Sequence, residues 1–187
     1  MRTTGSRISL AVPAAVLLAA LFSPAAQAVL KVGDAAPAFT TQAAVAGKPF
    51  SFDMKAALAK GPVVLYFFPK AFSQGCTIEA HAFAEATPQF KAMGAQVVGM
   101  SHDDIATLQR FSTEACRDQF AVASDPQAQT IRAYDASAAA NPQRADRISY
   151  VIGQDSKIKF AHVGSDPNEH VEQTKAAVQR LQGSTRK

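Results

Sequence analysis

Two cysteines are the residues of this chain whose type and placement most directly favour chemistry. Cys76 follows an apolar run and a turn at residues 69–75, and it stands where a helix is expected to begin. There a sulfur faces unpaired backbone N–H groups and the positive end of the helix dipole, which favour the thiolate. Because the thiolate is the nucleophile, the placement predicts a reactive cysteine. A buried cysteine that only packs as a small hydrophobic residue is the alternative.

Two neighbours of Cys76 in the turn suit the same chemistry. Ser73, three residues before the cysteine, can turn its hydroxyl toward the sulfur or toward a bound oxygen. Gly75 carries no side chain and allows the backbone to approach a small ligand closely.

The segments around Cys76 predict an α/β protein. Residues 63–68 are apolar without alternation and rich in β-branched and aromatic side chains, which is typical of a strand buried on both faces. A helical pattern runs from Cys76 to about Met93, with Pro88 expected to break or kink it. Residues 96–101 predict a second buried strand.

The remaining chain continues the alternation of strands and helices. We expect a helix at 103–116 capped by Asp103 or Asp104, a short strand at 120–124, a short helix at 126–134, an exposed loop at 136–146, a hairpin of strands 148–152 and 157–163, and a closing helix at 168–181. This order predicts a mixed β-sheet flanked by helices, and it fits the thioredoxin fold.

The N-terminal segment predicts a cleaved signal peptide at residues 1–28, followed by one domain at 29–187. Two arginines precede an apolar run at 8–22, and Ala26-Gln27-Ala28 supplies the small-x-small pattern of a cleavage site. The run holds about 15 residues, fewer than the roughly 20 that a bilayer-spanning helix needs. An uncleaved anchor is the alternative. We therefore expect an exported protein, located in the periplasm.

The charge of the chain is too mild to indicate a polyanionic partner. The formal net charge is +4 at pH 7, and loss of Arg2 and Arg7, with no acid beside them, lowers it to +2. This argues against nucleic acid and against an anionic membrane as partners. Both cysteines lie in the mature part, where an oxidising compartment would let a disulfide persist.

The sequence around Cys76 resembles the peroxiredoxin family. Pro69-x-x-x-Ser73-x-x-Cys76 matches the family signature, in which Thr or Ser stands three residues before the cysteine. The wider string at 67–80 resembles the bacterioferritin-comigratory, or peroxiredoxin Q, branch. Further likeness at 32–39, 124–126 and 147–152 extends over nearly all of the mature chain.

The resemblance implies a thioredoxin-fold peroxidase that reduces hydrogen peroxide and alkyl hydroperoxides. Cys76 would attack the peroxide, and Arg147 would fold back to stabilise the thiolate and the departing oxygen. Ser73 would bond the peroxide oxygens, Pro69 would shield the sulfur, and Glu79 would orient the arginine through an ion pair.

Without the resemblance, the charged residues of this set have simpler interpretations. Arg147 is then a surface charge at the start of a strand, and Arg144, three residues earlier, is its rival for the site. Glu79 alone is more often a solvated helix residue.

The second step of such a cycle needs a partner thiol, because peroxide attack leaves Cys76 as a sulfenic acid. Many members of the branch carry that resolving cysteine five residues after the first, where this chain has His81. Cys116 is the remaining candidate and would have to approach within about 6 Å, Cα to Cα. A bystander thiol or a static disulfide is the alternative, and Cys76 would then rely on an outside thiol.

No cofactor is expected, either metal or organic. The four histidines show no metal-ligand spacing, and nothing indicates haem or flavin; they are His81, His102, His162 and His170. The expected partners are a peroxide substrate and a thiol reductant, thioredoxin-like or another dithiol protein. We expect a monomer or a weak dimer.

Three other functions compete with a peroxidase. A thioredoxin-like oxidoreductase needs a second cysteine three residues after the first, where Glu79 stands, and an exported metal chaperone needs it four residues after, where Ala80 stands. A peroxide sensor or a client-binding protein without turnover remains open, because its first oxidation step is the same. The joint presence of Ser73, Cys76 and Arg147 favours turnover.

Overall fold

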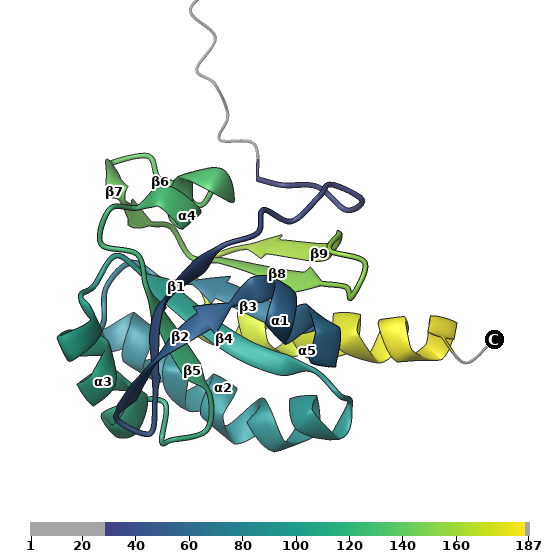
Figure 1. Ribbon diagram of the computed structural model, residues 1–187, viewed down its shortest axis with the longest axis horizontal. Helices are drawn as coiled ribbons and strands as arrows, with labels where there is room; N and C mark the ends of the chain where they lie inside the picture. The colour runs from purple at the N-terminus through teal and green to yellow at the C-terminus, as the bar shows by residue number, and fades with distance from the viewer. Residues whose placement is uncertain (1–28, 186–187) are drawn as a thin grey trace, which may run out of the picture.

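A computed structural model describes residues 29–185, which form nine strands and five helices (Figure 1). The strands are β1 (Thr40–Val45), β2 (Lys48–Asp53), β3 (Val63–Phe67), β4 (Gln96–Ser101), β5 (Ala121–Ser124), β6 (Ser137–Ala138), β7 (Asn141–Ala145), β8 (Ile148–Ile152) and β9 (Ile158–Val163). The helices are α1 (Met54–Lys60), α2 (Gln74–Ala92), α3 (Ile105–Glu114), α4 (Gln129–Ala133) and α5 (Pro167–Thr185).

A seven-stranded mixed sheet in the order β2-β1-β5-β4-β3-β8-β9 forms the centre of the molecule. The strands β3, β4 and β5 are parallel, and β8 pairs antiparallel with β3 while β1 pairs antiparallel with β5. The predicted hairpin is confirmed, since β8 and β9 are antiparallel neighbours at one edge. The predicted mixed sheet with flanking helices is confirmed as well.

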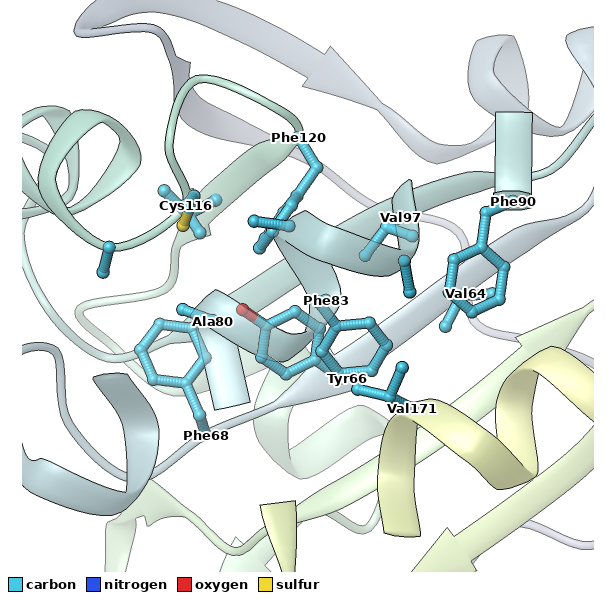
Figure 2. Packing of buried hydrophobic residues seen from close by; sticks show 14 of the residues in the cluster. Val64, Tyr66, Phe68, Ala80, Phe83, Phe90, Val97, Cys116, Phe120 and Val171 are labelled. Atoms are coloured by element: carbon cyan, nitrogen blue, oxygen red, sulfur yellow. The ribbon is translucent and has the colours of Figure 1, made fainter. Parts of the chain in front are cut away.

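The sheet has a core on each face, and β3 contributes to both. Its five residues are all buried, which confirms the strand predicted from the unbroken apolar run. Val64 and Tyr66 point to the face covered by α2, α3 and α5, while Val63 and Leu65 point to the face covered by α1 and α4. Figure 2 shows the first of these clusters, in which the ring of Tyr66 in β3 lies against the ring of Phe83 in α2.

The helix α2 continues through Pro88, so of the predicted break or kink the break is wrong. A proline in a helix interior removes one backbone hydrogen bond and crowds the preceding turn. Here Phe83 and Phe90, on either side of it, are both fully buried in the core. The packing of this apolar face holds the 19-residue helix together across the missing bond.

Residues 136–146 are not the simple exposed loop that their composition predicted. They contain β6 and β7, which pair as a separate antiparallel ribbon, and Ala136 and Ala145 are fully buried at its ends. The polar residues that suggested a loop lie on the exposed part of the ribbon, whereas the two buried alanines attach it to the core.

The pattern of the sequence did not predict β1, β2 and α1. In β2 four of six residues are exposed, and in β1 the buried pair Ala43 and Ala44 is preceded by polar residues. Strands of this kind lack both the apolar run and the strict alternation that indicate a strand. They are recognisable as strands only through their pairing, β1 with β5 and β2 with β1.

The predicted signal peptide, residues 1–28, lies outside the described residues. Within residues 29–185, none of the helices has the length and apolarity that crossing a membrane requires.

Gly99 in β4 leaves space for the ring of Tyr66 in the neighbouring strand, and this generates a test of the packing. A methyl group at Gly99 would lie 2.7 Å from Cζ of Tyr66. We expect Gly99→Ala to lower the free energy of unfolding, measured by urea denaturation, by roughly 1–3 kcal/mol through overpacking. Gly183→Ala is the control, because nothing lies within 4 Å of its added methyl group. Equal stability of the two variants would contradict this packing.

Candidate active site around Cys76

Cys76 lies in the first turn of α2, as the sequence predicted. The strand β3 ends at Phe67, the chain turns, and Ser73 occupies the N-cap position with extended backbone angles. The first hydrogen bond of the helix joins the Thr77 N–H to the Ser73 carbonyl, so the N–H groups before it have no helical acceptor. The Cys76 side chain is buried, with 1% of its surface exposed. The thiol therefore lies in a shielded position at the positive end of the helix.

Arg147 reaches Cys76 from the start of β8, and its Nη2 lies 3.6 Å from the Cys76 Sγ. The sheet explains this contact between residues 71 positions apart. Because β8 runs antiparallel to β3, Ile148 pairs with Phe67 at the end of β3. The residue before Ile148 consequently lies beside the turn that leads into α2. The guanidinium brings a permanent positive charge and several donors to the sulfur.

Glu79 binds the guanidinium through the nitrogen that does not contact the sulfur. It stands one helical turn after Cys76 on the same face of α2, is fully buried, and accepts a hydrogen bond and ion pair from Arg147 Nη1. Burial raises the pKa of Glu79 to about 8, although the charge of Arg147 opposes this rise. The carboxyl is therefore less ionised than one in water, so it positions the guanidinium while cancelling only part of the positive charge that faces the sulfur.

Gly75 makes room for the arginine. A methyl group at this position would lie 3.1 Å from Arg147 Nη2, closer than side chains normally pack. The sequence suggested that this glycine admits a small ligand. In the structure the group that comes close to it is the guanidinium.

Ser73 and Pro69 belong to the same turn but do not contact the sulfur through hydrogen bonds. The Ser73 hydroxyl donates to the Lys70 carbonyl at 2.9 Å, so it points along the turn and not toward Cys76. Pro69 is half-buried directly after Phe68. The structure thus places both residues beside the site, and their roles toward a peroxide stay predictions.

Asp103 is a positioning residue that sequence reasoning assigned to a different task. It was one of two candidate helix caps, but Asp104 caps α3 by accepting from the Thr107 N–H. Asp103 instead accepts from the Ala71 N–H at 2.7 Å and from the Ser101 hydroxyl at 2.8 Å. It ties the turn before Cys76 to the end of β4. The sequence offered one indication of this role: two adjacent acids, Asp103 and Asp104, precede a helix that needs only one of them as its cap.

Cys116 lies just beyond the end of α3, and its thiol is fully buried in the same core cluster as Cys76. Both cysteines are free. Burial raises the pKa of the Cys116 thiol well above its ordinary value, and the nearby charge of Asp118 raises it further. Cys116 as it stands is consequently a protonated thiol and a poor nucleophile.

His170 is a core residue with both ring nitrogens engaged. Its Nδ1 lies 2.8 Å from the Ser149 hydroxyl and its Nε2 lies 3.0 Å from the Gly164 carbonyl. Burial lowers its pKa to about 4. Across residues 29–185, no three His, Cys, Asp or Glu side chains are grouped so that they could hold a metal ion.

A cavity of about 370 Å³ lies away from this site, lined by parts of β2, α1, β4, the segment that leads into β5, and the later turns of α2. None of its lining residues belongs to the predicted site. A peroxide has few atoms and needs no cavity of this size, so the chemistry is assigned to the turn around Cys76.

A buried cysteine opening a helix after the central strand of a mixed sheet, with an arginine returned to it by the neighbouring strand, defines a thioredoxin-fold thiol protein. Residues 32–161 match the AhpC/TSA family. The chain belongs to this family, and the resemblance to the peroxiredoxins is confirmed.

Individual relatives agree with this assignment. The chain is 30% identical to a chloroplastic peroxiredoxin Q of Populus jackii over 151 residues, covering 80% of this chain and 68% of that one. It is 29% identical to a chloroplastic peroxiredoxin Q of Triticum aestivum over 121 residues, 64% of this chain. The chain spans only 55% of the length of the Triticum relative and of two Oryza relatives.

Solved structures confirm the fold class. Peroxidoxin BcpB from Mycobacterium tuberculosis superposes with a TM-score of 0.71 at 26% identity, covering 81% of this chain and 98% of that one. The AhpC of the same organism superposes with a TM-score of 0.74 at 20% identity, covering 84% and 96%, and supports the fold alone.

The raised pKa of Glu79 gives the stability of the protein a pH dependence. Between its ordinary value of 4.5 and about 8, the folded chain holds a proton that the unfolded chain has released. The contribution of this group to the free energy of unfolding is therefore present below pH 4.5 and is lost as pH rises toward 8. Relative to Glu79→Gln, the wild type should lose on the order of a few kcal/mol across this window in chemical denaturation.

Glu85→Gln serves as the control, because Glu85 lies on the same helix with 71% of its side chain exposed. Its effect on the free energy of unfolding should be small beside that of Glu79→Gln, because the Glu85 carboxyl stays in water in the folded protein. A pH-independent difference for Glu79→Gln would show that the carboxyl has an ordinary pKa.

Proposed function

We propose that this protein is a thiol peroxidase that reduces hydrogen peroxide and alkyl hydroperoxides with Cys76 as the attacking residue. The observation that supports it best is the 3.6 Å contact between Arg147 Nη2 and Cys76 Sγ, made at the positive end of a helix. Membership of the AhpC/TSA family supports the same activity. A guanidinium held by Glu79 against a thiol is suited to stabilising an anionic sulfur and an anionic leaving oxygen.

In the first step the Cys76 thiolate attacks one oxygen of the peroxide. The S–O bond forms with an electron pair of sulfur, and the O–O bond breaks with its bonding pair leaving on the second oxygen. That oxygen is then protonated to water or an alcohol. Arg147 supports both anions, first the thiolate and then the departing oxygen. Ser73 would assist if its hydroxyl turned from the Lys70 carbonyl toward the substrate, and Pro69 would limit access of water.

In the second step, Cys116 would resolve the sulfenic acid of Cys76 as a disulfide. The segment that carries Cys116 is held mainly by local bonds: its N–H donates to the Phe111 carbonyl and its carbonyl accepts from the Gln119 N–H. Arg117 and Asp118 follow with left-handed φ angles of 50° and 62°, which cost energy in residues other than glycine. Unwinding this turn would release that strain and free the thiol to move.

The cycle would be closed by an external thiol reductant, thioredoxin-like or another dithiol protein. We further propose that the protein is exported after removal of residues 1–28, because their pattern is that of a signal peptide. The N-terminal residue of the protein recovered from the periplasm, expected near Val29, tests this location.

The roles of the two cysteines can be separated by peroxide consumption with dithiothreitol as reductant. We expect Cys76→Ser to abolish consumption, because it removes the nucleophile, and Cys116→Ser to weaken turnover. After one equivalent of peroxide, intact mass should show an internal disulfide in the wild type and a sulfenic acid in Cys116→Ser. Consumption by the wild type no faster than that of an ordinary free thiol would exclude the enzyme and favour a sensor or binding role.

The role of the guanidinium can be tested against a neighbouring arginine. Arg147→Met should slow the oxidation of Cys76 by roughly 100-fold, because it removes the charge and the donors next to the sulfur. Arg144→Met is the matched control, since Arg144 lies three residues earlier in β7. It should oxidise at the wild-type rate, measured by stopped-flow competition for hydrogen peroxide. Equal rates for the two variants would contradict the assignment.

A further inference from the structure

The hydroxyl of Tyr66 is a polar group buried in the apolar core. It is the only residue with a side-chain hydroxyl in β3, it is fully buried, and its hydroxyl has no hydrogen-bond partner. A buried hydroxyl left unpaired destabilises a folded protein, and phenylalanine would fill almost the same volume without that cost. The group therefore points to a use in a state other than the reduced, resting protein.

The ring of Tyr66 is held in one orientation. It stacks on Phe83 with ring centroids 4.4 Å apart, and Phe120 packs edge-on against it at 5.9 Å. Gly99, in the next strand, leaves no side chain beneath the ring. Figure 2 shows the hydroxyl oxygen at the end of the ring that faces the Cys116 side of the cluster. The packing of the ring thus fixes the direction of the hydroxyl toward the Cys116 side of the cluster.

The surroundings of this hydroxyl include both thiols. Cys76 and Cys116 belong to the same buried cluster as Tyr66. Burial raises the pKa of Tyr66 well above its ordinary value, and negative charge on Cys116, on Glu79 or on Cys76 would raise it further. In the reduced protein neither sulfur is hydrogen-bonded to the hydroxyl. Contact would therefore form only when Cys116 moves toward Cys76.

We propose that the Tyr66 hydroxyl relays a proton between the two cysteines while their disulfide forms. This inference rests on the proposed function, in which Cys116 resolves the sulfenic acid of Cys76. The buried Cys116 thiol must lose a proton to attack, and the sulfenic hydroxyl must gain one to leave as water. A hydroxyl that both sulfurs reach when Cys116 moves toward Cys76 could give one proton and take the other in the same step, so that no charge has to be created in the apolar cluster.

The step balances in atoms and electrons. Cys116 sulfur uses an electron pair to form the S–S bond, and the S–O bond of the sulfenic acid breaks with its pair leaving on oxygen. The proton of the Cys116 thiol passes to the Tyr66 oxygen while the Tyr66 proton passes to the departing hydroxyl. The products are the disulfide and one water, and Tyr66 is unchanged. The Cys76 sulfur is reduced and the Cys116 sulfur is oxidised by equal amounts.

Asp118 is the rival group for the proton of Cys116. It is exposed, it lies two residues after the cysteine, and its charge acts on the Cys116 thiol. As an exposed carboxylate it would take the proton to solvent and would leave the departing hydroxyl without a donor. The two assignments can be separated by substitution.

The test follows disulfide formation in the full chain after one equivalent of hydrogen peroxide, quenched at timed intervals with dimedone and N-ethylmaleimide and analysed by intact mass. We expect Tyr66→Phe to oxidise Cys76 at the wild-type rate but to form the disulfide roughly tenfold more slowly or worse, with sulfenic acid accumulating. Asp118→Asn should form it at the wild-type rate. A solvent deuterium effect on this step should be present in the wild type and smaller in Tyr66→Phe.

Tyr150→Phe is the matched control, because Tyr150 is equally buried on the opposite face of the sheet and its hydroxyl donates to the Tyr134 carbonyl at 2.8 Å. Its melting temperature should fall while its disulfide forms normally. Tyr66→Phe should show the reverse: an unchanged or higher melting temperature and a slower disulfide. This crossed pattern separates a relay from a packing defect.

The possible failures are distinguishable. If the wild type oxidises Cys76 but forms no disulfide with Cys116, the resolving step and the relay are both overturned. If the disulfide forms in Tyr66→Phe within about twofold of the wild-type rate, the relay alone is overturned. Slow disulfide formation in Asp118→Asn with a normal rate in Tyr66→Phe would assign the proton transfer to Asp118.

Discussion

The contact between the Arg147 guanidinium and the buried Cys76 sulfur depends on the antiparallel pairing of β8 with β3. That pairing places the start of β8 beside the end of β3, where the chain turns into α2. Two neighbours support this contact. Gly75 leaves room for the guanidinium, and Glu79 binds its other nitrogen. A slip of β8 by one residue would carry Arg147 to the opposite face of the sheet, since side chains alternate along a strand.

Charge at the site is controlled by burial as much as by pairing. Taking the Glu79 carboxyl out of water raises its pKa and lets it position Arg147 while neutralising it only in part near neutral pH. The same apolar surroundings keep Cys116 protonated and inert. The two buried thiols thus differ: the Arg147 guanidinium lies 3.6 Å from the Cys76 sulfur, whereas burial keeps the Cys116 thiol protonated.

Most of the fold and part of the site could be predicted from the sequence. An unbroken apolar run predicted β3, and the breaker-bounded segment that follows predicted a helix with Cys76 in its first turn. The strands β1 and β2 escaped prediction because their pairing, and not their composition, makes them strands. The prediction of a break at Pro88 was wrong for a related reason. The local conformational preference of proline favours a break, but burial of Phe83 and Phe90 stabilises the continuous helix.

What the sequence by itself determined is a reactive cysteine at a helix start, its family likeness, and the set of residues that accompany it. Only the tertiary structure decided which of Arg147 and Arg144 contacts the sulfur, that Ser73 turns to Lys70, and that Asp103 ties the turn. It also decided that Tyr66 is buried in the same cluster as both cysteines, with a hydroxyl that has no hydrogen-bond partner. The physical reason is that propensity and helix-end charge act over a few neighbouring residues, whereas strand register and burial join residues far apart in the chain.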